Sequence, residues 1–284
     1  MLTTDEPSST LTDEAALYHE VSGGGPVALL IAGTPGDSSQ FAPLAAAMSS
    51  RYTVVTYDRR GTSRSPRPIG WSTTSVAEQA DDAAGILMGV TSEPALVYGT
   101  SNGAAVALEL ALRHPKRVRA VLLHELPLLT VLAEPEPVGR MLGQLIGAAM
   151  EQGGPAKALD AFLRFAYGGE LVDRLDPELR EQMYANAEMI FTIEMPGFQT
   201  YRPDEAALRS IGVPTRVLVG EDQAVPLFEE AAAWLAERIG TTVVRSPGGH
   251  GAHLSHPAEL AAFISSHDPP SLRPAGRPRL TNDR

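Results

Sequence analysis

The segment "ALVYGTSNGAAVALELAL", residues 95–112, joins two kinds of sequence pattern at a serine. Its first four residues are apolar and typical of a buried strand, whereas its last nine are rich in alanine and leucine and typical of a helix. Between them lies "GTSNG", a G-x-S-x-G element centred on Ser101. This element alone is weak evidence, but a strand before it and a helix after it predict a sharp turn with the serine at its tip.

The predicted turn gives Ser101 a chemical role. Its hydroxyl would face the amino terminus of the following helix, whose free N–H groups and dipole stabilise a developing oxyanion. Glycines flank the serine where crowding at the turn leaves little room for a side chain. We therefore predict that Ser101 is a nucleophile; the alternative is a glycine-rich turn that contains an incidental serine.

The same strand-then-helix pattern extends along the chain. Short apolar runs lie at residues 27–33, 52–58, 95–99, 120–124, 216–220 and 241–246, and helical patterns lie at 39–50, 75–90, 102–115 and 227–240. Alternation of this kind predicts βαβ units, and hence an α/β fold with a mostly parallel β-sheet flanked by helices. The two runs within residues 17–31 are expected to form an antiparallel edge.

The alternation stops between residues 126 and 210, where only amphipathic helical patterns occur. We expect an all-helical cap there, between a first core part at 1–125 and a second at 211–267. The cap holds five of the eight methionines, which are expected to pack its own core, and some of them can also line an adaptable apolar pocket. Residues 268–284 are rich in proline and arginine and are expected to be a disordered tail.

Composition narrows the partners of this 284-residue chain. Its formal net charge of -11 argues against a nucleic-acid or anionic-membrane partner and favours a small-molecule substrate; its oligomeric state is undetermined. Cysteine is absent, which removes thiolate nucleophiles, thiolate zinc sites and disulfides. The amino-terminal residues lack the charge and apolar run of a signal peptide and no run is long enough to span a membrane, so we expect a cytoplasmic protein.

Two further loops, with the serine turn, carry a resemblance to a known family. "IAGTPGDSSQF" at residues 31–41 resembles an oxyanion loop of the form H-G-x-P-G, with Ala32 in place of the histidine. "YDRRGTSRSP" at residues 57–66 resembles a D-x-R-G-x-G-x-S loop, with Ser63 in place of the second glycine. From about Tyr18 to Ile264 the chain resembles the α/β-hydrolase family.

The resemblance implies roles for residues in these loops. The backbone N–H groups of Thr34, beside Gly33, and of Asn102 would bind the oxyanion. Because these donors belong to the backbone, the change at Ala32 does not put them in doubt. Asp58 and Arg60 are expected to be structural.

A serine hydroxyl needs a base to take its proton. The segment "GGHGAHLSHPAEL", residues 248–260, contains three histidines after the last predicted strand. By the resemblance, His250 directly after the glycine pair is the base, and His253 and His256 pack or cap the following helix. A metal site is the weaker interpretation, because no Asp, Glu or Cys within the cluster completes a ligand set.

The acid that orients His250 has two candidates. The family usually places it in the turn after the penultimate strand, here "VGEDQAVP" at residues 219–226, where the expected third position after Gly220 is Gln223 and Asp222 is the nearest suitable acid. Some members place it one strand earlier, where Glu125 ends an apolar run and needs a partner if buried. His124 beside it should face the opposite way. We leave both candidates open, with a slight preference for Asp222.

These residues predict a serine hydrolase that cleaves an ester, lactone or thioester bond of a small apolar molecule through an acyl-enzyme, with no cofactor or metal. Serine at the turn disfavours dehalogenase and epoxide hydrolase chemistry, for which this fold uses aspartate. The alternatives are a cofactor-free perhydrolase or haloperoxidase-like enzyme, a proline-iminopeptidase-like peptidase, and a non-catalytic ligand receptor on the same fold. Fold resemblance does not identify the substrate.

Overall fold

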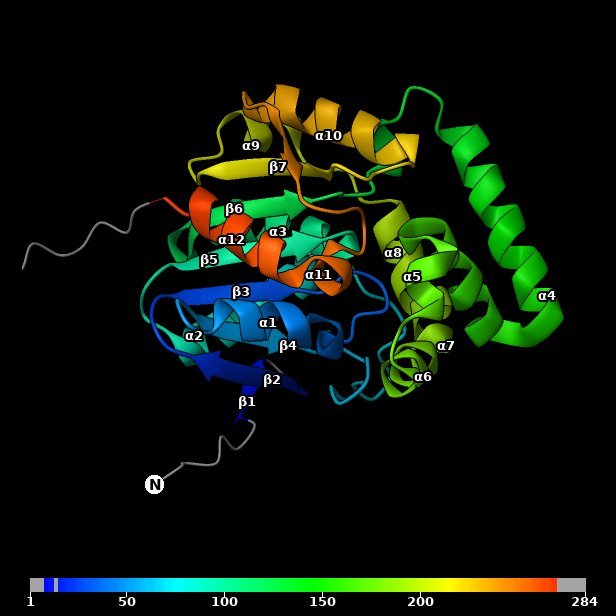
Figure 1. The fold of residues 1–284 in the computed structure, drawn as a ribbon, viewed down its shortest axis with the longest axis horizontal. Helices are drawn as coiled ribbons and strands as arrows, with labels where there is room; N and C mark the ends of the chain where they lie inside the picture. Colours follow the sequence, from blue (N-terminus) through cyan, green and yellow to red (C-terminus); the bar gives the residue numbers. More distant parts are fainter. Residues whose placement is uncertain (1–7, 13–14, 270–284) are drawn as a thin grey trace, which may run out of the picture.

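A computed structural model describes residues 8–12 and 15–269, and the expected tail lies almost wholly outside the described residues. The described residues form one eight-stranded sheet in the order β1-β2-β4-β3-β5-β6-β7-β8 (Figure 1). The strands are β1 (Ser8–Thr12), β2 (Ala15–Gly23), β3 (Val27–Ile31), β4 (Thr53–Tyr57), β5 (Ala95–Thr100), β6 (Val118–His124), β7 (Thr215–Gly220) and β8 (Val243–Ser246). From β4 to β8 across the sheet all pairs are parallel, which confirms the predicted fold class.

The expected antiparallel pairing within residues 17–31 is wrong. β2 and β3 do not pair with each other; β2 pairs antiparallel with β4, and β3 lies between β4 and β5. The difference follows from burial, because β3 is apolar and almost wholly buried, as a central strand must be. β2 carries the exposed Glu20 and lies nearer the edge.

Helices cover both faces of the sheet. They are α1 (Ala42–Met48), α2 (Val76–Val90), α3 (Asn102–Arg113), α10 (Pro226–Ile239), α11 (Ala252–Ser255) and α12 (Pro257–His267), with short 3₁₀ turns η1 (Ser38–Phe41) and η2 (Pro115–Arg117). The apolar side chains of α2, α3 and α10 form one buried cluster with the sheet, and those of α1, α11 and α12 form another. The two clusters hold the sheet rigidly, so the loops at its carboxyl edge are anchored on both sides.

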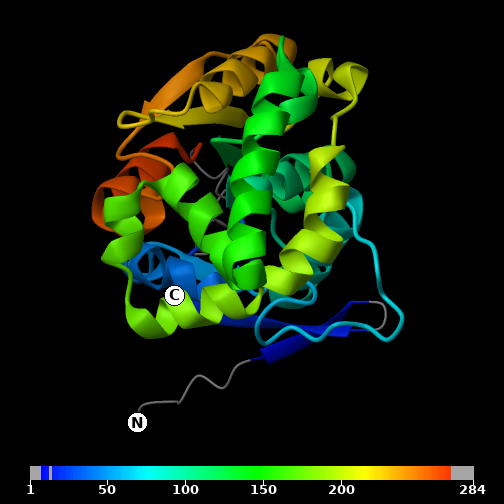
Figure 2. The ribbon, with the colours of Figure 1, turned by 90° about the vertical axis from the view of Figure 1, so that its right-hand side faces the viewer.

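Between β6 and β7 the described elements are all helical. They are η3 (Leu129–Val131), α4 (Pro135–Tyr167), α5 (Gly169–Asp173), α6 (Pro177–Ala185), α7 (Ala187–Met189), the π-helix η4 (Ile190–Glu194), α8 (Met195–Gln199) and α9 (Glu205–Arg209). We call residues 126–210 the cap. The bulk of it lies against the carboxyl ends of the parallel strands, with α4 along its outer side (Figures 1 and 2).

The cap has a small apolar core of its own. Met183 and Met189 pack there with Leu159, Leu163 and Ile190, while Met195 lines a pocket next to Ser101. Met195 also packs against this core, so the cap methionines serve both expected uses and one residue serves the two together. α4 bends where Gly153 and Gly154 leave helical geometry just before Pro155. Within the described residues no helix has the length and apolarity needed to cross a membrane.

Candidate active site

Ser101 occupies a strained turn between β5 and α3. Its φ of 53° and ψ of -130° lie outside the regions that non-glycine residues favour, which costs about 1–3 kcal/mol. The residue is 5% exposed and its backbone N–H donates to the His124 carbonyl oxygen at 2.9 Å. The neighbouring strand thus helps to hold the serine at the tip of the predicted turn.

Both flanking glycines are required by close backbone contacts. A Cβ on Gly99 would lie 2.3 Å from the Gly103 carbonyl oxygen, and a Cβ on Gly103 would lie 2.2 Å from that of Ile31. A Cβ on Gly33 would lie 2.7 Å from Ser101 Cβ, so the loop after β3 passes directly against the serine. The G-x-S-x-G element is therefore explained by how tightly β3, the serine turn and α3 approach one another.

The predicted oxyanion donors lie on either side of this contact. Asn102 Nδ2 donates to Thr34 Oγ1 at 2.9 Å, and both residues are more than nine-tenths buried. Asn102 is the first residue of α3, where a backbone N–H has no acceptor within the helix. Among the described residues the Thr34 N–H has no backbone acceptor either. Both groups are free to bind a ligand oxygen, and the oxyanion hole stays a prediction.

The structure joins His250 to Glu125. His250 Nδ1 lies 2.6 Å from Glu125 Oε2, and both side chains are almost wholly buried. The Phe228 ring stacks on the imidazole at 4.4 Å between centroids, and the cap residue Tyr167 lies at 5.6 Å. These contacts hold the ring with Nδ1 bound to the carboxylate, and among the described residues Nε2 has no hydrogen-bond partner. Both Ser101 and His250 are described, and no hydrogen bond joins them; such bonds often tighten only when substrate binds.

This geometry supports Glu125, rather than the slightly preferred Asp222, as the partner of His250, and the identity of the acid stays a prediction. Asp222 is exposed, and among the described residues its carboxylate has no hydrogen bond or ion pair. Its backbone N–H donates to the Gly248 carbonyl oxygen at 3.0 Å, which ties the short turn after β7 to the loop after β8.

The Glu125 carboxylate is surrounded by donors. It accepts from the Gly220 N–H at 2.8 Å and from Gln223 Nε2, in addition to His250. Burial by itself would raise the pKa of Glu125, but the His250 hydrogen bond, the two nearby imidazoles and the Gly220 N–H lower it to about 2. The Glu125 carboxyl group is therefore ionised at neutral pH. Sequence reasoning missed Gln223 as a site residue, although it stands at the third position after Gly220 where the family usually carries its acid.

His124 does not face away from Glu125 as expected. Its Nε2 lies 3.8 Å from Glu125 Oε1, and its Nδ1 lies 3.1 Å from the Thr100 hydroxyl. Glu125 has a φ of 50°, so the strand alternation that would separate the two side chains ends there. Burial lowers the pKa of His124 to about 4, so this imidazole is neutral at neutral pH.

The other two histidines of the cluster have separate partners. His253 Nε2 lies 3.0 Å from Gln40 Oε1, and His256 Nδ1 lies 2.9 Å from the Ser255 hydroxyl. In residues 8–12 and 15–269 no group of three or more His, Cys, Asp or Glu side chains is placed to hold a metal ion. The three imidazoles of residues 248–260 thus do not converge.

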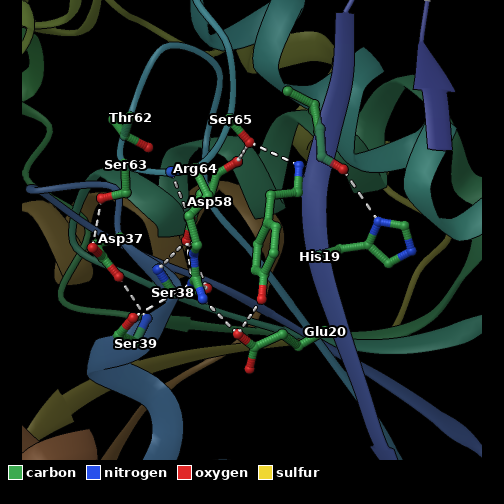
Figure 3. A network of polar contacts seen from close by, with 12 residues as sticks. His19, Glu20, Asp37, Ser38, Ser39, Asp58, Thr62, Ser63, Arg64 and Ser65 are labelled. Carbon is green, nitrogen blue, oxygen red and sulfur yellow. Dashed lines mark hydrogen bonds and ion pairs between the residues drawn. The ribbon is translucent and has the colours of Figure 1, made fainter. Parts of the chain in front are cut away.

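Asp58 and Arg60 contact other parts of the core rather than the site. Asp58 accepts from the Ser38 N–H and hydroxyl at 2.9 and 2.7 Å and pairs with Arg64 (Figure 3). Arg60 Nε donates to Asp82 on α2 at 2.9 Å. These contacts anchor the loop after β4, as a structural role requires.

A small pocket opens beside Ser101, with a cavity volume of about 50 Å³. Its lining comes from the serine turn, the loop after β6, the cap and α10: Ser101, Asn102, Pro127, Leu129, Leu142, Ile146, Phe162, Phe165, Ala166, Met195, Phe198, Gln199, Leu227 and Phe228. None of these described lining residues is charged. The pocket therefore suits an uncharged, largely apolar group.

Comparison with known proteins identifies the family. Residues 28–263 match the Alpha/beta hydrolase family. The chain is 31% identical over 267 residues to the uncharacterized hydrolase YraK of Bacillus subtilis (strain 168), covering 89% of this chain and 92% of that protein. It is 30% identical over 262 residues to the putative carbamate hydrolase RutD of Caulobacter sp. (strain K31), covering 87% and 94%.

Solved structures agree at the level of fold. The enol-lactonase from Burkholderia xenovorans LB400 superposes with a TM-score of 0.72 at 18% identity, covering 90% of this chain and 97% of that one. The chain belongs to the α/β-hydrolase family, which confirms the resemblance. It is related to named hydrolases over nearly its whole described length.

Proposed function

We propose that this protein is a serine hydrolase that cleaves an ester, lactone or thioester bond of a small, uncharged molecule. The observation that carries the proposal is the buried contact of 2.6 Å between His250 Nδ1 and Glu125 Oε2, beside a strained serine turn. A buried imidazole held by an ionised carboxylate is suited to accept a proton at its other nitrogen. Ser101, on the neighbouring turn, is the hydroxyl that supplies it.

In the proposed reaction Ser101 Oγ attacks the substrate carbonyl carbon while His250 Nε2 takes its proton. The carbonyl oxygen becomes an oxyanion that accepts from the Thr34 and Asn102 N–H groups. His250 then gives the proton to the leaving oxygen or sulfur, and the bond to the leaving group breaks to form an acyl-enzyme. Water, activated by His250, attacks the acyl-enzyme by the same steps and releases the acid.

The charges around His250 support this role. Glu125, with a pKa of about 2, remains a carboxylate and stabilises the imidazolium that forms during each proton transfer. His124 nearby has a pKa of about 4 and so brings no competing positive charge at neutral pH. The negative charge of Glu125 therefore balances the positive charge that forms transiently on His250 within the buried site.

The pocket supports an apolar substrate. Its lining is apolar except for Ser101, Asn102 and Gln199. A charged acyl group would lose its hydration there without gaining a partner. The relative named a putative carbamate hydrolase adds carbamates to the compounds that merit testing.

The test begins with a fluorophosphonate probe, which labels an activated serine. We expect labelling of the wild-type protein at Ser101 and none of Ser101→Ala. A panel of neutral acyl esters, lactones, thioesters and carbamates then identifies which type of bond the protein hydrolyses. A charged acyl ester serves as the comparison. Absence of labelling in folded wild-type protein, together with no turnover in the panel, contradicts the proposal and favours a non-catalytic receptor. Peroxide-dependent halogenation that exceeds hydrolysis favours the perhydrolase alternative.

A further inference from the structure

The loop that carries the predicted oxyanion donor Thr34 contacts the cap through buried polar groups. Two cap residues take part: Glu194 at the end of the π-helix η4, and Asn186 just before α7. Both are 5% exposed or less. Neither contacts Ser101 or His250 in the described structure, so the catalytic mechanism above does not use them.

Glu194 acts on this loop through Arg59. Arg59 Nη1 lies 2.7 Å from Glu194 Oε2, and Nη2 donates to Glu194 Oε1 at 2.8 Å; both side chains are fully buried. The same Nη2 donates to the Gly33 carbonyl oxygen at 3.1 Å. The guanidinium therefore links the π-helix of the cap to the backbone next to Thr34.

The Gly33 carbonyl and the Thr34 N–H belong to one peptide unit. In a planar trans peptide these two groups point in opposite directions. A donor that fixes the Gly33 oxygen on one side therefore fixes the direction of the Thr34 N–H on the other. The Gly36 N–H, from the loop itself, also donates to this oxygen at 2.6 Å.

Asn186 holds the opposite side of Thr34. Its Nδ2 donates to the Pro35 carbonyl oxygen at 3.3 Å and to the Ser63 hydroxyl at 2.9 Å, and its Oδ1 accepts from the Ser63 N–H at 2.8 Å. The cap thus holds the carbonyl on each side of Thr34, directly at Pro35 and through Arg59 at Gly33.

We propose that Glu194, with Arg59, and Asn186 are positioning residues that aim the Thr34 N–H at the oxyanion, so that seating of the cap sets the strength of the oxyanion hole. This inference rests on the proposed hydrolase function. A buried ion pair is a poor source of stability, since well-packed apolar residues often replace it without loss. An ion pair can instead hold a hydrogen-bond donor in a fixed direction and so orient a peptide group. Apolar residues cannot do this.

The test compares Glu194→Gln with the wild type on a matched pair of substrates, a p-nitrophenyl ester and its thionoester. Sulfur accepts hydrogen bonds poorly, so the ratio of the oxo to the thiono rate reports how well the N–H donors meet the oxyanion. We expect kcat for the ester to fall by about 10- to 100-fold, which is less than the effect of deleting a donor outright, with KM changed by less than about twofold. The oxo-to-thiono ratio should fall as well, and Asn186→Ala should lower it in the same direction.

The double variant Arg59→Met/Glu194→Leu separates positioning from folding. Because it removes both buried charges together, it should recover the thermal stability that Glu194→Gln loses, while the Gly33 oxygen still lacks its guanidinium donor. We expect stability to return and the oxo-to-thiono ratio to stay low. Met183→Ala, in the core of the cap, is the control: it lowers thermal stability but leaves the side chains of Glu194 and Asn186 that contact the loop, so it should keep the wild-type ratio.

The outcomes for the two proposals are distinct. A wild-type protein that neither reacts with the fluorophosphonate nor turns over any substrate overturns the hydrolase function itself. An active wild type with inactive Ser101→Ala, but a folded Glu194→Gln whose ratio equals that of the wild type, overturns only the positioning role. Recovery of the ratio together with stability in the double variant also overturns it.

Discussion

The assignment of Glu125 as the acid can be tested by Glu125→Gln, which keeps the size of the side chain and removes its charge. The carboxylate accepts from three donors: the Gly220 N–H, Gln223 Nε2 and His250 Nδ1. A glutamine has a single side-chain oxygen to offer these three donors. Any donor that this oxygen does not bind faces the glutamine NH₂ group instead. If the oxygen stays with Gly220 at 2.8 Å, the amide nitrogen faces His250.

The expected magnitude follows from the tautomer of His250. Opposite an amide N–H, Nδ1 becomes an acceptor and the proton moves to Nε2, which then cannot take the proton of Ser101. A trapped tautomer of this kind lowers kcat by about 10⁴-fold, equivalent to about 5 kcal/mol of transition-state stabilisation. KM should change little, because Glu125 does not line the substrate pocket.

The assay is hydrolysis of a short p-nitrophenyl ester by wild type, Glu125→Gln, Asp222→Asn and Ser101→Ala, the last setting the background. Circular dichroism confirms that each variant is folded. Asp222→Asn changes an exposed side chain outside the site and should retain at least half of the wild-type kcat. Glu125→Gln within tenfold of wild type, with Asp222→Asn reduced more than a hundredfold, would refute the assignment.

Three further predictions follow from the structure. Gln223→Leu removes one of the three donors to Glu125, which raises the pKa of that carboxyl and loosens His250; we expect kcat to fall about tenfold at unchanged KM, measured beside Asp222→Asn. Burial lowers the pKa of His253 from 6.5 to about 3, so the unfolded chain binds a proton that the folded protein does not, and stability falls as pH drops below 6.5. His253→Gln should therefore lose about 2 kcal/mol less stability than the wild type between pH 7 and pH 5, as measured by urea unfolding at each pH. Gly103→Ala, whose Cβ would lie 2.2 Å from the Ile31 oxygen, should destabilise the protein by more than about 3 kcal/mol, whereas Gly139→Ala on open α4 should be neutral or stabilising by up to about 1 kcal/mol; an equal effect of both in thermal unfolding would contradict the packing argument.

The parts of the molecule that sequence reasoning predicted well are those decided by local pattern. The buried strands are continuous apolar runs, the helices between them are amphipathic, and the serine turn joins one to the other, so fold class follows from periodicity and composition. The pairing of β2 was predicted wrongly, because which strands pair depends on contacts across the sheet. Burial of β3 on both faces places it in the centre of the sheet, away from β2. A local sequence pattern does not indicate which strands lie beside a buried strand.

The acid was the part of the site that sequence could not decide. Asp222 and Glu125 both follow apolar strands, and both are close to the right place along the chain. What separates them is the backbone of two turns: a φ of 50° at Glu125, and the hydrogen bond that ties Asp222 to Gly248 at 3.0 Å. A positive φ at a glutamate is not readable from its neighbours, and the same φ overturned the expectation that His124 faces away.

Gln223, at the usual acid position, explains how Glu125 would serve as the proposed acid from the earlier strand. A carboxylate at position 223 would lie against Glu125 Oε2, where two like charges at one buried imidazole would raise each other's pKa. Glutamine keeps a similar reach and supplies a donor instead, and its Oε1 is fixed in turn by the Val225 N–H at 2.6 Å. The turn after β7 therefore still contributes to the orientation of His250, but through a neutral amide that contacts Glu125, the proposed acid, after β6. In the proposed site the charged residue, Glu125, follows β6, and the residue that orients it, Gln223, follows β7. A change at either position should therefore alter how His250 is held.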